Sequence, residues 1–135
     1  MAIVVVNNGQ AIITNLVSGI GGTIPKNIGW GTGNQTTALV TDTGLGPTTV
    51  EKLVDLSTSA GTDHTVGSVS RTTTTVTNDT VTVTGTRTAT GAGAVTVSGL
   101  FDAASGGTLW IKADFAAINL AVGDSIAYTW NDKFS

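Results

Sequence analysis

The chain has 135 residues, of which 11% are charged, and its formal net charge at pH 7 is −3. This length is typical of a single domain, so we expect one domain over residues 1–135. The sequence offers no basic stripe for phosphate contacts and no apolar run long enough to cross a membrane, so we expect neither nucleic-acid binding nor membrane insertion. Cysteine is absent, which excludes disulfides and sulfur-ligated metal sites.

The first third of the chain is predicted to hold a strand, a helix and an irregular strand. Residues 3–6 are continuously apolar, which favours a buried strand. The helical spacing of apolar residues over 10–17 predicts a two-turn helix, which Asn8 could cap and Gly19 could end. Glycines flank the tryptophan of KNIGWGTG (26–33), which favours an irregular strand packed closely against another part of the chain.

A long connection follows, in which the periodicity is ambiguous. Residues 50–56 could form a strand or a short helix, because the spacing of their apolar residues fits both. His64, the only histidine, falls in a predicted loop over 57–65, and we expect it to be solvated.

Residues 66–89 are rich in threonine and predict a hairpin. Asn78 and Asp79 both tolerate positive φ, so they predict a two-residue turn that places Val76 opposite Val81. Threonine occurs throughout both arms, and we expect it on both faces. This hairpin is therefore expected to be exposed or to lie against a neighbouring chain.

The last third is predicted to be the most regular part of the chain. Three strand-like runs, 94–101, 109–115 and 125–130, are each bounded by Gly, Asp or Ser. In the second run, apolar residues alternate with Trp110, Lys112 and Asp114, which predicts one apolar face and one charged, outward face.

These patterns together predict an all-β fold. We expect a jelly-roll-like β-sandwich of about eight strands, with one or two short helices. The connection over 33–66 could be the overhanging loop of a jelly roll.

Residue types that carry catalysis are sparse, so we predict that the protein is not an enzyme and has no catalytic residue, cofactor or metal ligand. Asp63 and His64 could contribute to a triad with a serine, but neighbours in one loop do not make a triad. Other acidic residues are expected in turns and on outward strand faces. Trp30, Trp110 and Trp130 could form a sugar-stacking platform, although aromatic residues in a small β domain are more often core or interface anchors.

Three segments carry a family resemblance: IGWGTGNQTTAL (28–39), SGLFDAASGGTLWIKADF (98–115) and INLAVGDSIAYTW (118–130). Their order resembles that in a group of small structural proteins of tailed bacteriophages, some of which are capsid cement or decoration proteins with a jelly-roll fold and others of which are tail-associated. The usual pattern has an acidic residue before GLF, where Ser98 stands here.

The resemblance implies a virion structural protein that is made in the host bacterial cytoplasm and binds the outer capsid surface. There it would cement adjacent subunits of the major capsid protein, and it would associate with itself as a homodimer or homotrimer. The alternatives are a phage tail or fibre component and, from another class, a carbohydrate-binding β-sandwich. We expect deletion of residues 1–6 to weaken capsid binding while leaving the fold.

The residues expected to make contacts are those of the N-terminal strand, of the hairpin tip and of two tryptophans: Ala2, Ile3, Val4, Val5 and Val6; Val76, Thr77, Asn78, Asp79, Thr80 and Val81; Trp30 and Trp110.

Overall fold

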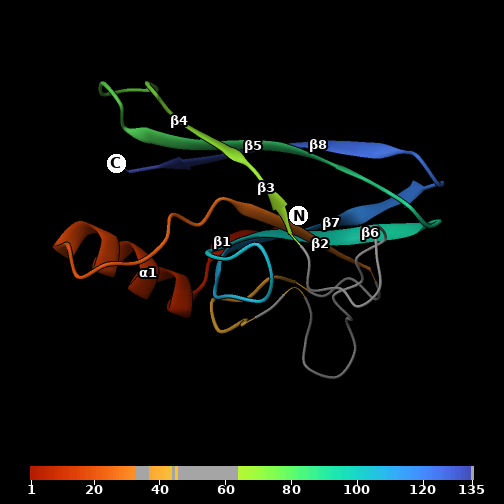
Figure 1. The fold of residues 1–135 in the computed structure, drawn as a ribbon, viewed down its shortest axis with the longest axis horizontal. Coiled ribbons are helices and arrows are strands. Elements are labelled where there is room, and N and C mark those ends of the chain that lie inside the picture. The colour runs from red at the N-terminus through yellow and green to blue at the C-terminus, as the bar shows by residue number, and fades with distance from the viewer. Residues whose placement is uncertain (33–36, 44, 46–63, 135) are drawn as a thin grey trace.

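The computed structural model describes residues 1–32, 37–43, 45 and 64–134. In this part of the chain, two antiparallel sheets lie one over the other, and a helix lies at one end (Figure 1). The larger sheet has the strand order β1-β7-β6-β2-β3, and the smaller has the order β4-β5-β8. These sheets confirm the predicted all-β sandwich of eight strands. The predicted element at 50–56 and residue Asp63 lie outside the described residues.

The elements have the following bounds: β1 Ile3–Val5, α1 Asn7–Ser18, β2 Asn27–Thr32, β3 Thr65–Val66, β4 Ser68–Thr72, β5 Thr80–Thr88, β6 Gly93–Phe101, β7 Leu109–Leu120 and β8 Ser125–Lys133. The three strand-like runs predicted in the last third are therefore correct as β6, β7 and β8.

The chain crosses from the larger to the smaller sheet at Gly67, the single residue between β3 and β4. Its N–H donates to the Lys26 carbonyl over 2.8 Å. A Cβ at this position would lie 2.8 Å from that same oxygen and 2.8 Å from Cγ1 of Val83. The close approach of the two sheets at this point therefore requires glycine.

The helix α1 has 12 residues and is longer than predicted. It begins at Asn7, so Asn8 lies inside it and does not cap it, and Val6 at the N-cap makes no side-chain cap. The first turn is held by tertiary packing, because Gly9 lies directly on the backbone of Trp110. Gly19 ends the helix in the left-handed conformation, as predicted, with φ of 71°.

The hairpin between β4 and β5 differs from the predicted two-residue turn. Thr72 pairs with Thr80, so residues 73–79 form the loop, and Val81 pairs with Arg71 rather than with Val76. Among the described non-glycine residues, Asn78 alone has positive φ. A two-residue turn was wrong because the Asp79 side chain organises a longer loop.

Threonine in β5 is confined to one face, contrary to the expectation of threonine on both. Val81 and Val83 point inward and pack in the core cluster around Ile28, while the alternate threonines point outward. The sequence of β5 therefore behaves as a half-buried strand.

Both faces of β7 are covered from Leu109 to Asp114, so the prediction of a charged outward face was wrong. Lys112 is 0% exposed, and its Nζ donates to Oδ2 of Asp42 over 2.9 Å. Oδ2 of Asp114 accepts the N–H of Ala38 over 2.7 Å. The segment that contains Ala38 and Asp42 thus covers this face of the larger sheet.

Three apolar clusters hold the sandwich together. The first lies between the sheets around Ile28, Val83 and Leu100, and the second, at the other end, surrounds Trp30 and Val95. The third lies on the outer side of the larger sheet and comprises Val6, Leu45, Val97, Phe101 and Leu109.

Candidate functional site

The hairpin tip is exposed and tightly organised. Val76 is 66% exposed, and Thr77 and Asn78 are also exposed. Asp79 is buried, and its carboxylate accepts the backbone N–H groups of Thr74, Thr75 and Val76 over 2.8 to 2.9 Å. The bond from Val76, followed by those from Thr74 and Thr75, holds the pKa of Asp79 well below its usual range. Of the residues predicted to make contacts at the tip, Val76, Thr77 and Asn78 are therefore exposed and able to contact a partner.

The remaining two residues of the predicted tip, Thr80 and Val81, have a structural role. Thr80 is almost fully buried, and its hydroxyl donates to Oδ1 of Asp79 over 3.0 Å. Val81 is half-buried and packs against the core cluster. The structure thus separates an exposed tip from a structural base.

The N-terminal strand is an edge strand rather than a buried one. Ile3 is 60% exposed and pairs with Ala113, while Ala2, Val4 and Val5 are half-buried. Val6 is completely buried. Within the predicted N-terminal contact segment, Ile3 therefore presents the largest free apolar surface. This strand belongs to the larger sheet, whereas the tip extends the smaller one (Figure 1).

Trp30 and Trp110 are core residues, at 1% and 2% exposure. Trp30 lies under the guanidinium of Arg87, whose Cζ is 5.0 Å from the ring centroid. The sugar-stacking platform is therefore contradicted, since it requires at least two exposed tryptophans on one face.

His64 is buried, contrary to the expectation of a solvated loop histidine. Its ring stacks on that of Phe101 with centroids 4.0 Å apart, and its Nδ1 lies 2.8 Å from the Ala103 carbonyl oxygen. The residues that the structure describes contain no group of three or more His, Cys, Asp or Glu that could hold a metal ion. No helix in the described ranges is long and apolar enough to span a membrane.

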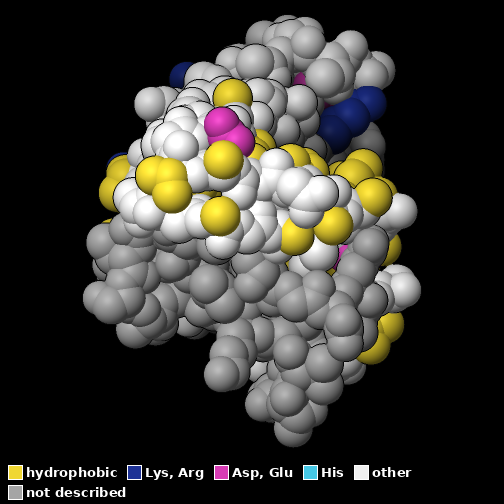
Figure 2. Space-filling view, turned by 90° about the vertical axis from the view of Figure 1, so that its right-hand side faces the viewer, with side chains coloured by type: hydrophobic (Ala, Val, Ile, Leu, Met, Phe, Trp, Pro, Cys, Tyr) yellow, Lys and Arg dark blue, Asp and Glu magenta, His cyan; other side chains and the backbone are white. Residues whose placement is uncertain are grey.

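The outward face of the smaller sheet is made almost entirely of uncharged polar residues, and we call it the threonine face. Its members are Ser68, Ser70, Thr72, Thr80, Thr82, Thr84, Thr86, Thr88, Ser125, Ala127, Thr129, Asn131 and Lys133. Lys133, at its margin, is the one charged residue in this set. Among the described residues on the side of the molecule shown in Figure 2, charged side chains are also sparse, and hydrophobic ones are scattered between other side chains and backbone.

Hydroxyl groups on the threonine face bond to one another across the strands. Oγ1 of Thr72 lies 3.0 Å from Oγ1 of Thr82, which donates to Oδ1 of Asn131 over 2.8 Å. At the other end, Oγ1 of Thr88 lies 2.7 Å from Oγ of Ser125. These bonds hold the side chains in place, so little side-chain entropy remains to be lost when the face is covered. The strict alternation TVTVTGTRT in β5 is the sequence signal that indicates this face.

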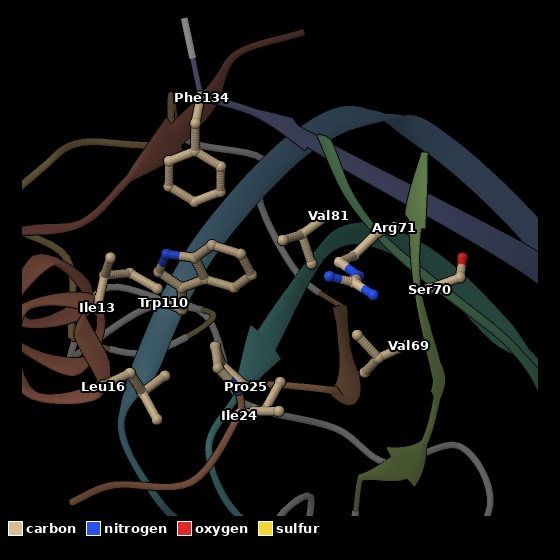
Figure 3. A pocket seen from close by; sticks show the side chains of 10 residues that line it. All are labelled: Ile13, Leu16, Ile24, Pro25, Val69, Ser70, Arg71, Val81, Trp110 and Phe134. Atoms are coloured by element: carbon tan, nitrogen blue, oxygen red, sulfur yellow. The ribbon is translucent and has the colours of Figure 1, made fainter. Parts of the chain in front are cut away.

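Two of the openings in the described part of the chain flank the inner side of the smaller sheet. The first, a groove of about 480 Å³, separates α1 from β4 and β5 (Figure 3). Ile13, Leu16 and Trp110 line one side, and Val69 and Val81 line the other. Arg71 is the only charged residue of this lining. The groove therefore suits an apolar side chain with a carboxylate beside it.

The second opening lies on the other side of the sandwich, and we call it the β7–β8 cleft. It has a volume of about 680 Å³. Its lining is mostly apolar and comprises Met1, Ile3, Ser98, Ala113, Phe115, Ala116, Ile118, Ala127, Tyr128, Thr129 and Trp130. At its rim Met1 and Ile3 are largely exposed, and Ile118 is 41% exposed.

Comparison with protein-family models, with curated proteins and with solved structures found no match.

Proposed function

We propose that this protein is a structural component of a bacteriophage virion that binds the outer surface of the capsid. In this role it cements adjacent subunits of the major capsid protein. The proposal rests on the resemblance of three segments to phage structural proteins, and the threonine face is the observation on the molecule that supports it best.

The threonine face suits burial against another protein because it carries little charge. A buried charge costs several kcal/mol unless it is paired, whereas a hydroxyl needs a single hydrogen-bond partner. The face exposes hydroxyls on all three strands, except at Thr80 and Thr82, which are buried, and it has one lysine at its margin. The exposed tip residues Val76, Thr77 and Asn78 extend from the same sheet and add contacts beside it.

A cement role also accommodates weak individual contacts. Each copy touches more than one capsid subunit, and contacts made together raise the overall affinity well above that of a single one. The groove beside Arg71 adds a site for an apolar side chain with an acidic neighbour.

Co-sedimentation with phage capsids that lack the protein tests this proposal. We expect saturable binding at a fixed copy number and a higher temperature of capsid disruption. Thr86→Lys places a charge on the exposed part of the threonine face, opposite Ala127, and should abolish most of the binding. Val17→Lys is the matched control, because Val17 is exposed on α1, away from this face.

Other outcomes of this experiment would change the proposed role of the protein. Equal binding by the Thr86→Lys and Val17→Lys variants would remove the threonine face from the interface. Retention by phage tails and not by capsids would replace the capsid role by that of a tail component. Binding to neither would overturn the proposal.

A further inference from the structure

Strand β8 has one edge without a strand partner in the described part of the chain. It ends the sheet β4-β5-β8, and its nine residues pair with β5 on one side. Edge strands are usually protected by proline, by a bulge or by charges. β8 has no proline, its register with β5 is continuous, and its two charges, Asp132 and Lys133, are confined to one end.

An added strand at this edge must present side chains of alternating character. Those that point inward must be apolar, to match the β7–β8 cleft, and those that point outward must be polar, to continue the threonine face. β8 itself has this pattern from Ser125 to Asn131, with Ile126, Tyr128 and Trp130 half-buried and the residues between them exposed, while Asp132 at its end is a half-buried charge on the inward side. The strand that fits the edge best is therefore a second β8.

We infer that two copies of this chain associate through antiparallel pairing of their β8 strands about a twofold axis at Thr129. The two smaller sheets then form one continuous sheet in the order β4-β5-β8-β8-β5-β4. Thr129 is the midpoint of Ser125–Lys133, so this register pairs all nine residues of β8. Any other centre shortens the overlap and leaves backbone groups without partners.

Most side chains of β8 are self-complementary in this register, and the exception is Asp132, a half-buried carboxylate that lies opposite the apolar Ile126. The opposed pairs are Thr129 with Thr129, Tyr128 with Trp130, Ala127 with Asn131, Ile126 with Asp132, and Ser125 with Lys133. No two like charges face each other. The aromatic pair occurs twice, and such cross-strand pairs are among the more stabilising ones.

The twofold axis also closes the β7–β8 clefts. It runs perpendicular to the continuous sheet, so the clefts of the two copies face each other across it. Their exposed apolar rims, at Met1, Ile3 and Ile118, then come together and leave water. This association needs no capsid, so it stands independently of the proposed function.

Sedimentation equilibrium tests the inference with charges placed on the axis. The wild-type chain should have twice its monomer mass of 13.5 kDa. Thr129→Lys and Thr129→Asp each oppose two like charges, and each should weaken dimerisation by about tenfold or more. Because Thr129 is exposed, both variants should fold normally. An equimolar mixture of the two should restore the dimer, since a lysine then faces an aspartate.

Thr84→Lys provides the matched control. Thr84 is the exposed neighbour of Thr129 on β5, whose two edges are both paired. This variant should dimerise like the wild type. A monomeric wild-type chain, or an oligomer that Thr129→Lys leaves intact, would overturn the inference. Failure of the mixed charge variants to associate would equally overturn it.

Discussion

Tyr128 is the only tyrosine, which makes its ionisation directly measurable. Burial raises its pKa to about 12. The neutral phenol is therefore favoured by folding. Its contribution to stability is fully present below the unfolded pKa of about 10 and is lost as the pH rises towards 12.

We expect the ultraviolet absorbance of the phenolate to appear with a midpoint of about 12 in the folded protein. In denaturant the midpoint should fall to about 10. Circular dichroism over the same pH range would show whether the fold persists. A midpoint near 10 in the folded protein would contradict the burial of this ring.

The contribution of Asp79 to stability depends on pH in the opposite direction. Its pKa is lowered by the N–H bonds that it accepts, so its contribution is present above the unfolded pKa of about 4 and is lost as the pH falls towards the folded value. Asp79→Asn should therefore lower the free energy of unfolding at neutral pH and reduce its loss in acid.

Urea unfolding of this variant at several pH values checks the prediction. Asp124→Asn is the control, since Asp124 accepts one N–H, that of Ala121, in its own turn. It should cost less stability than Asp79→Asn. Equal losses would mean that the three N–H bonds at the hairpin do not determine its stability.

At the scale of elements, Gly9 positions α1. In an exposed helix, Gly→Ala stabilises by about 1 kcal/mol. Here a Cβ would lie 2.5 Å from the Trp110 carbonyl oxygen and 2.6 Å from its Cα, and backbone cannot move aside as a side chain can. We expect Gly9→Ala to destabilise the protein by about 1–3 kcal/mol in urea unfolding. Asn8→Ala, at an exposed position of the same turn, should leave stability nearly unchanged. Stabilisation by Gly9→Ala would show that α1 does not pack on β7 in this way.

The elements also show where prediction from sequence succeeds. The regular alternation of β8 and the glycine after α1 act locally, so the strand and the end of the helix were predictable. The hairpin loop was not, because the Asp79 carboxylate bonds to three backbone groups and outweighs the turn preference of Asn78. The burial of Lys112 was not predictable either, because its partner Asp42 is far away in sequence.

The candidate site also has one feature that the sequence indicates locally and one that it does not. The threonine face was not predicted, because threonine was expected on both faces of the hairpin, although the alternation TVTVTGTRT within β5 indicates a single face. The free edge of β8 could not be predicted, because it depends on which strand ends the sheet, and this follows from three crossings between sheets rather than from any local pattern.

At the scale of the whole molecule, the N-terminal segment is part of the sandwich. Residues 3–5 pair with β7, and the completely buried Val6 belongs to the outer apolar cluster. Deletion of residues 1–6 should therefore destabilise the fold, by about 3 kcal/mol or more, contrary to the expectation from sequence. Ile3→Ser should change stability by less than about 1 kcal/mol, because Ile3 is mostly exposed. Thermal unfolding of both variants checks this, and a truncated protein as stable as the wild type would refute it.

The scarcity of charge on the threonine face has a kinetic consequence. A surface without a strong field does not steer its partner during diffusion, so its association rate constant should be of the order of 10⁵–10⁶ M⁻¹s⁻¹. That rate should change little with ionic strength, because there is no long-range attraction for salt to screen. Differences in affinity among variants of this face should then appear in how long the complex lasts and not in how fast it forms.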